Sequence, residues 1–190
     1  MYNIKKMKED IMGYAIEVNF DKKSEDMLIE YWRLLCQNNI SSYMYKNGAH
    51  PHIAFAVFDE KTIDISRLKN IMNDYFSRIE PFEVIFSYLG LFPTNEGVGF
   101  IAPKVSQQLL EYHQGFYNEI CDNGYDAWFN DYYKPDVWIP HCTMTINTTN
   151  NNQMKGIELL RNTFKPFKAK ITRVSLVEFF PSKYLEVIEL

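Results

Sequence analysis

The sequence predicts an α+β fold in which two similar β-α-β-α-β lobes pack about a pseudo-two-fold axis, with a central cleft between two antiparallel-rich sheets. Two observations predict it. Residues 51–55 (PHIAF) and 140–144 (PHCTM) are near copies of each other, and the elements around them occur twice in the same order. Because such packing places equivalent strands beside each other, we expect both Pro-His segments at one cleft.

The first lobe is expected over residues 14–90. Alternating apolar residues predict a strand at 14–20, and a Ser-Glu-Asp start followed by apolar residues at helical spacing predicts a helix from 24 to about 39. A Tyr-rich loop then leads into the first Pro-His strand. A helix near 66–79 and a strand near 82–89 complete the unit.

The second lobe, over residues 97–190, repeats this order within what we expect to be a single domain of residues 1–190. A longer loop before the second Pro-His strand accounts for the difference in length between the lobes. The predicted elements are strands at 98–102, 138–146, 171–180 and 184–188 and helices at 105–121 and 154–164.

The two Pro-His strands have the same pattern of faces. Successive side chains of a strand point to opposite sides, so His52 shares a face with Ala54, and His141 shares a face with Thr143 and Thr145. An imidazole followed by small side chains leaves room above the strand, whereas the opposite faces are apolar. The pattern therefore predicts a cleft wall in each lobe.

Composition restricts the function classes. With 46% hydrophobic and 23% charged residues, the chain can bury a sizeable core, and its net charge of −4 argues against capture of duplex DNA. The three cysteines are widely spaced without a C-x-x-C, which favours a reduced, cytoplasmic setting over a disulfide framework or a zinc site. The first 13 residues lack an apolar core for secretion, and no segment has the length of a membrane span. We expect a monomer without a membrane partner.

Two H-x-[TS]-x motifs on equivalent strands of a duplicated chain resemble the 2H phosphoesterase superfamily, which includes bacterial 2′-5′ RNA ligase-like proteins and cyclic phosphodiesterases. Residues 141–144 match the motif fully, and residues 52–55 match it except that Ala54 stands where the family has Thr or Ser. The resemblance extends to residues 89–93, 98–103 and 184–188, and thus covers the chain from Tyr14 onward.

The resemblance implies a metal-independent phosphoesterase that opens a 2′,3′-cyclic phosphate or cleaves a 2′-5′ linkage in a nucleotide or RNA end. His52 and His141 would divide the general acid and base roles, without a cofactor. Thr143 would donate a hydrogen bond to a phosphate oxygen. Ala54 cannot do so, and a neighbour such as Tyr43, Tyr45 or Thr145 would have to replace it.

Aromatic and basic residues precede both Pro-His strands and are candidates for substrate binding. Bases stack on such rings, and a lysine beside the phosphate would supply positive potential. The candidates are Tyr43, Tyr45 and Lys46 in the first loop, Tyr132, Tyr133 and Lys134 in the second, and Thr145.

Alternatives remain open. Loss of the hydroxyl at position 54 favours a catalytically weakened module that binds nucleotides or RNA ends, and the acidic balance favours a hydrolase of a non-nucleotide phosphodiester. His50 and His52 could form an H-x-H metal pair, although no carboxylates at ligand spacing accompany them. His113, in helical sequence, is expected to be structural. Three points stay open at the level of sequence: the substrate, whether the reaction is hydrolysis or ligation, and which histidine is the base.

Overall fold

A computed structural model of the protein describes residues 13–58, 63–94, 96–126, 129–179 and 182–190. Seven antiparallel strands form its sheet in the order β2-β1-β6-β3-β4-β5, with β7 paired to β6. The strands are β1 (Tyr14–Phe20), β2 (His52–Phe58), β3 (Phe82–Leu91), β4 (Gly99–Pro103), β5 (Cys142–Thr145), β6 (Phe167–Glu178) and β7 (Lys183–Glu189).

Strand β6 joins the two halves of this sheet. Its first residues pair with β3, while the rest of its length pairs with β1 on one side and β7 on the other. One half is therefore β2-β1-β6-β7 and the other is β6-β3-β4-β5. The predicted α+β class with antiparallel sheets is confirmed. The sequence lobes interleave, since β6 from the second half of the chain lies between β1 and β3 from the first.

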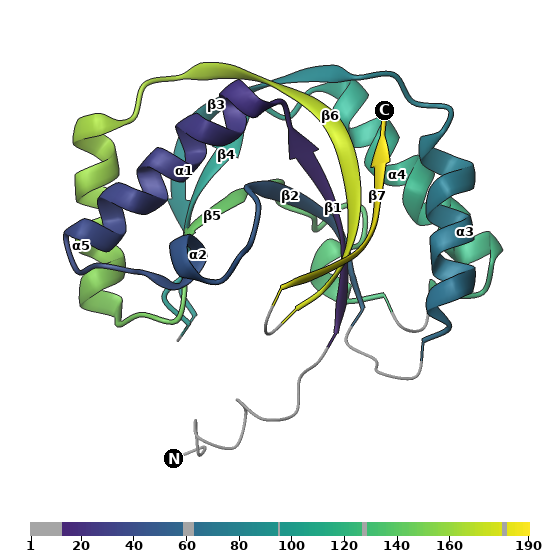
Figure 1. Ribbon diagram of the computed structural model, residues 1–190, viewed down its shortest axis with the longest axis horizontal. Helices are drawn as coiled ribbons and strands as arrows, with labels where there is room; N and C mark the ends of the chain where they lie inside the picture. Colours follow the sequence, from purple (N-terminus) through teal and green to yellow (C-terminus); the bar gives the residue numbers. More distant parts are fainter. Residues whose placement is uncertain (1–12, 59–62, 95, 127–128, 180–181) are drawn as a thin grey trace, which may run out of the picture.

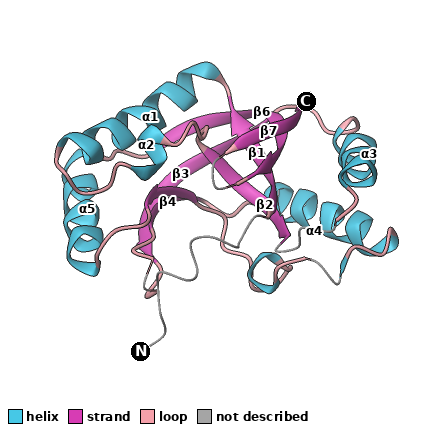
Figure 2. Cartoon of the chain, turned by 60° about the horizontal axis from the view of Figure 1, so that its bottom comes forward, coloured by secondary structure: helices cyan, strands magenta, loops and turns pink. Residues whose placement is uncertain are grey.

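Helices flank the sheet at both ends, and the sheet arches between them (Figures 1 and 2). Helices α1 and α5 lie at one end, and α3 and α4 lie at the other. Each long helix begins after a side chain that accepts a hydrogen bond from its first turn, as Asp21 does from the backbone of Ser24. The helices are α1 (Lys22–Gln37), α2 (Tyr43–Lys46), α3 (Ile65–Phe76), α4 (Gln107–Asp122) and α5 (Asn150–Thr163), with a 3₁₀ turn η2 (Asp131–Tyr133).

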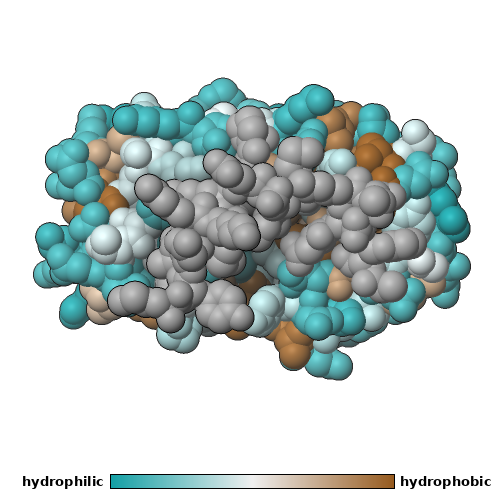
Figure 3. Space-filling view, turned by 90° about the horizontal axis from the view of Figure 1, so that it is seen from below, coloured by the Kyte–Doolittle hydropathy of each residue, from teal (hydrophilic) through white to brown (hydrophobic). Residues whose placement is uncertain are grey.

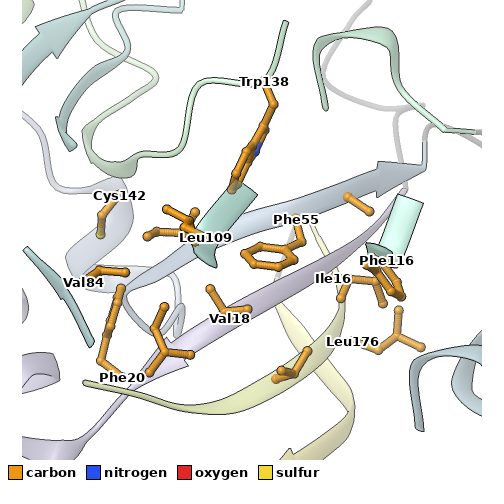
Figure 4. Close-up of a cluster of buried hydrophobic side chains, with 14 of the residues drawn as sticks. Ile16, Val18, Phe20, Phe55, Val84, Leu109, Phe116, Trp138, Cys142 and Leu176 are labelled. Carbon is orange, nitrogen blue, oxygen red and sulfur yellow. The ribbon is translucent and has the colours of Figure 1, made fainter. Parts of the chain in front are cut away.

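The apolar face of the strands packs against the helices. Figure 4 shows Val18 and Phe55 from adjacent strands together with Leu109 and Phe116 from α4, and all four are fully buried. This is the apolar alternation that predicted the strands, and its burial is the main favourable contribution to folding.

The opposite face of β1 and β2 is polar. Glu17 is paired with Ala54, and Asn19 is paired with His52, so these four side chains leave the sheet on one side. Ser175 of β6 is paired with Glu17 and extends this surface. We call it the cleft face.

The second Pro-His strand is shorter than predicted. It covers only Cys142–Thr145, where it pairs with β4, and His141 precedes it directly. Residues before His141 instead run along the outer edge of β2: Asn130 donates its backbone N–H to Val57, and the Trp138 indole donates to Ala54. Pro140 also lacks the N–H that a longer ladder would need.

In the part of the chain that the structure describes, every helix is too short or too polar to cross a membrane. Seen from below in Figure 3, the coloured surface is mostly hydrophilic, with only small hydrophobic areas between the polar side chains.

Candidate active site

His52 and His141 are held in the same way. Nδ1 of His52 lies 2.8 Å from the carbonyl oxygen of His50, and Nδ1 of His141 lies 2.7 Å from that of Ile139. A carbonyl oxygen can only accept, so Nδ1 is the donor in both rings. In the neutral imidazole this leaves the Nε2 atom as the proton acceptor. Each imidazole is therefore held in the same tautomer by the residue two positions before it.

His52 begins β2 and His141 directly precedes β5, and these two strands contact each other. Strands β2 and β5 are at opposite ends of the strand order, yet they contact each other because the sheet is curved. Burial lowers the pKa of His52 to about 4. Burial also lowers the pKa of His141, and the nearby charge of His52 lowers it further. Both imidazoles are consequently neutral at neutral pH before substrate binds.

Two tryptophans tie the motif strands to the rest of the fold. The Trp32 indole donates to the carbonyl oxygen of Thr143 at 2.8 Å, and the Trp138 indole donates to that of Ala54 at 3.0 Å. These carbonyls lie two residues after His141 and His52, respectively. The same position is thus fixed in both motifs.

His113 supports one of these contacts. Its ring stacks on Trp138 with the centroids 3.7 Å apart and 3° between the planes, and its Nε2 lies 3.1 Å from the carbonyl oxygen of Phe55. It is buried in the core. This placement agrees with the structural role expected for His113.

The surroundings of His141 are aromatic. Its ring centroid lies 5.1 Å from those of Phe92 and Phe100. Phe100 lies over Gly90, where an added Cβ would be 2.4 Å from the Phe100 ring. The missing side chain at Gly90 is therefore what allows Phe100 to lie against His141.

The surroundings of His52 are polar, and Glu17 is the nearest carboxyl group. Oε2 of Glu17 lies 3.3 Å from Nδ1 of His52, but that nitrogen already donates to His50. Only 6% of Glu17 is exposed, and its Oε2 has no hydrogen-bond partner among the residues that the structure describes. Burial raises the pKa of Glu17 to about 8, against the opposing effect of the nearby His50.

The side chain of His50 contacts Glu25. Its Nδ1 pairs with one oxygen of Glu25, and Arg173 binds the other oxygen at 2.8 Å. The backbone N–H of His50 donates to the Tyr184 hydroxyl at 2.7 Å. These contacts fix the loop before β2. Within the described ranges, no group of three or more His, Cys, Asp or Glu side chains is arranged to hold a metal ion.

The two predicted threonines, Thr143 and Thr145, differ in exposure. Thr143 is partly exposed and is paired with Phe100 of β4. Thr145 is buried, and its hydroxyl donates to Gly97 at 2.8 Å and accepts from Gly99 at 2.9 Å. The Thr145 hydroxyl therefore already has a donor and an acceptor within the protein.

The predicted binding residues of the first loop lie at or near a surface pocket. Tyr43 and Lys46 line a pocket of about 410 Å³ with Ile146 and Thr148, which follow β5, and Tyr45 is exposed. A second pocket, of about 570 Å³, lies against Trp138 and α4. Neither pocket is lined by the two motif histidines.

Tyr132, Tyr133 and Lys134 lie along the outer edge of β2. The 3₁₀ turn that contains both tyrosines contacts β2, and Tyr132 is highly exposed. Lys134 pairs with Asp131 at 2.7 Å. Residues 127–128 of this aromatic loop lie outside the described residues.

Five residues of the candidate site were not among the sequence candidates: Glu17, Trp32, Phe92, Phe100 and Trp138. Glu17 had a usable signal, because it is an acidic residue in an otherwise largely apolar strand and alternates with Asn19. The tryptophan contacts had none, since each joins residues more than 80 positions apart.

Comparison with known proteins gives the family. A model described as the 2′-5′ RNA ligase superfamily matches residues 21–179. A search of curated protein sequences finds no match. The fold is similar to LigT of E. coli in a complex with 3′-AMP, with a TM-score of 0.56, 12% identity and coverage of 95% of this chain and 99% of that chain. A protein of Thermus thermophilus has a TM-score of 0.62 and 15% identity over 94% of this chain and 98% of its own.

The family match spans both histidine motifs and most of the described sheet, and it supports a phosphoesterase kind of function. The solved structures, at such low identity, show the likeness of fold alone. On the family match, this chain belongs to the 2′-5′ RNA ligase superfamily, as the paired Pro-His motifs indicated.

Proposed function

We propose that the protein is a metal-independent phosphoesterase that opens 2′,3′-cyclic phosphates or cleaves 2′-5′ phosphodiester linkages in nucleotides or RNA ends. The observation that carries the proposal is the matched restraint of His52 and His141. Both rings donate through Nδ1 to a backbone carbonyl two residues earlier and keep Nε2 for proton transfer.

In the proposed reaction, one histidine removes a proton from water while the water oxygen bonds to phosphorus. The other histidine, protonated when the anionic substrate is bound, gives its proton to the ribose oxygen as the phosphorus–oxygen bond breaks. The product is a phosphomonoester with a free ribose hydroxyl, and the two rings exchange protonation states in each turnover. Thr143 donates from its hydroxyl to a non-bridging oxygen, where negative charge is held.

The nucleotide class is supported by the comparisons. LigT of E. coli has been solved with 3′-AMP and with phosphate, and the family match covers both motifs of this chain. Phe92 is a partly exposed aromatic ring beside His141, and the buried Phe100 packs against the same imidazole. Phe92 is better placed to contact a nucleotide there than Tyr132, which lies at the outer edge of β2.

A second candidate is a module that binds nucleotide ends without turnover. Ala54 favours it, because the first motif lacks the hydroxyl that Thr143 provides in the second.

The test is turnover in the presence of EDTA on a panel of 2′,3′-cyclic nucleotides and 2′-5′-linked dinucleotides, with His52→Ala and His141→Ala as matched controls. We expect the purified protein to turn over at least one class and each variant to lose nearly all activity. Binding without turnover across the panel would favour the binding module.

A further inference from the structure

Glu17 lies next to the place where the first motif lacks its hydroxyl. Glu17 and Ala54 are directly paired across β1 and β2, so both side chains leave the sheet on the cleft face. His52 is on the same face, two residues before Ala54. Paired Cβ atoms are about 4.5–5.5 Å apart, and a glutamate side chain can extend over a neighbouring alanine.

The Glu17 carboxyl group also needs a partner. Its Oε2 is buried without a hydrogen bond among the described residues, and the closest nitrogen, Nδ1 of His52, donates to His50 instead. Buried polar atoms in native proteins nearly always have a partner. The imidazole beside this oxygen, that of His52, is one that we place at the reacting phosphate.

We propose that Glu17 is a third catalytic residue, whose carboxyl group donates to the reacting phosphate the hydrogen bond that Ala54 cannot donate. The inference rests on the proposed phosphoesterase function. It assigns to a residue of β1 the role that the family's first motif places on β2.

A donor role requires a protonated carboxyl group, because a carboxylate can only accept and would repel a phosphate. Burial meets this requirement by raising the pKa of Glu17 to about 8. A carboxylic acid kept neutral by its surroundings is an established kind of hydrogen-bond donor in enzymes.

Burial has the largest effect on the pKa of Glu17, and the charge of the nearby His50 opposes it. Tyr184 and Cys142 stay neutral because burial raises the pKa of both. Arg173 is paired with Glu25, and this ion pair offsets its positive charge. The titratable and charged groups around Glu17 are His52 on β2, His50 before it, Cys142 on β5, Arg173 on β6, Tyr184 on β7 and Glu25 on α1.

The experiment compares removal of the donor with its replacement. We expect Glu17→Ala to lower kcat by about 100-fold or more, as loss of one such donor does elsewhere. Glu17→Gln should stay within about 10-fold of the wild type, because its amide can still donate. In the Glu17→Ala protein, adding Ala54→Thr should recover at least about 10-fold, whereas Ala54→Val, which matches threonine in shape but lacks the hydroxyl, should recover nothing.

Dependence on pH provides a second readout. Above about pH 8 the wild type should lose a further factor of about 10 in kcat/KM per pH unit as Glu17 ionises, and Glu17→Gln should not show this extra loss. In the wild-type background, Ala54→Thr should not raise kcat substantially, since Glu17 already provides the donor.

Near wild-type turnover in Glu17→Ala would overturn the proposal, as would a large gain from Ala54→Thr alone. Equal losses in Glu17→Gln and Glu17→Ala, with no rescue when Ala54→Thr is added, would also overturn it and assign Glu17 to holding His52. Thermal melts identify variants that fail to fold.

Failure of the proposed function has a different signature. If the wild type shows no turnover on any substrate of the panel, the phosphoesterase proposal fails. The donor is then tested by calorimetry with a nucleoside 2′-monophosphate at pH 6. Binding weakened about 10-fold or more by Glu17→Ala, and not by Glu17→Gln, supports the donor, and unchanged binding overturns it.

Discussion

The indole Nε1 of Trp138 lies 3.0 Å from the carbonyl oxygen of Ala54, so the segment before one histidine is bonded to the strand that begins with the other. Trp32 makes the corresponding contact with Thr143 at 2.8 Å. Both carbonyls are on edge strands, where the sheet supplies no partner on that side. The two contacts therefore help to fix the spacing of the imidazoles.

We predict that Trp138→Phe lowers kcat more than it raises KM, by about 10-fold, because the aromatic ring is kept while the Ala54 carbonyl loses its partner. Trp32→Phe should lower kcat in the same way, because the Thr143 carbonyl loses its partner. Steady-state kinetics and thermal melts measure the effect, with Tyr88→Phe, at an exposed position on β3, as the control. Lower melting temperatures with unchanged kcat would limit both tryptophans to stability.

The histidines should give an acidic pH optimum. Turnover requires one neutral and one protonated imidazole, so kcat/KM peaks between their two pKa values. Burial lowers the pKa of both, to about 4 for His52. As pH rises through these values the acid is lost, and kcat/KM should already fall between pH 6 and 8. A profile that rises toward pH 8 would contradict these assignments.

Much of the fold could be predicted because alternation and helix caps are local. The predicted strand at 14–20 coincides with β1, and most other elements are shifted by only a few residues. The second Pro-His strand was wrong in length, since residues 138–141 bond to the edge of β2 through Trp138 rather than to β4. The partner of this segment is determined by tertiary contacts, which a local sequence pattern does not contain.

The site was predictable only where chemistry repeats along the sequence. The duplicated motif indicated His52 and His141, and alternation placed Thr143 on the cleft side. The role of Glu17 depends on its pairing with Ala54, and that register is visible only once β1 and β2 are aligned. Tyr132 precedes His141 closely in sequence, but the turn that contains it contacts β2, and its proposed role in substrate binding stays a prediction.

We predict that Gly90→Ala lowers kcat. The new Cβ would be 2.4 Å from the Phe100 ring, so the ring must move, and His141 packs against it. Gly48→Ala is the control: its φ of +72° makes the substitution strained, but the new Cβ would meet nothing within 4 Å. Both variants should be less stable, and only Gly90→Ala should lose turnover. Equal kcat in the two variants would contradict a positioning role for Phe100.

Chelation should leave turnover unchanged, since the proposed proton transfers use two imidazoles. The measurement is kcat before and after dialysis against EDTA, followed by addition of Zn²⁺, Mn²⁺ or Mg²⁺. His50→Ala serves as a further check, because it removes one member of the H-x-H pair and leaves His52 in place. Activity lost on chelation and restored by one metal would overturn the metal-independent mechanism.

The final prediction concerns the stability that Glu17 costs the protein. Its pKa is raised from 4.5 to about 8 in the folded state, so the folded protein binds more protons than the unfolded chain between these values. The contribution of Glu17 to the free energy of unfolding therefore falls as pH rises through this window, by an amount on the order of a few kcal/mol for a shift of this size.

Glu17→Gln removes the titration and should reverse this loss. We expect the variant to match the wild type in stability near pH 4, to become progressively more stable than it between about pH 4.5 and 8, and to keep a constant advantage above that. Urea unfolding of both proteins across this range measures the difference. His113, whose pKa burial lowers to about 4, titrates in both proteins and cancels in the comparison. A pH-independent difference would mean that Glu17 titrates normally and is ionised at neutral pH, and a carboxylate there could not donate to a phosphate.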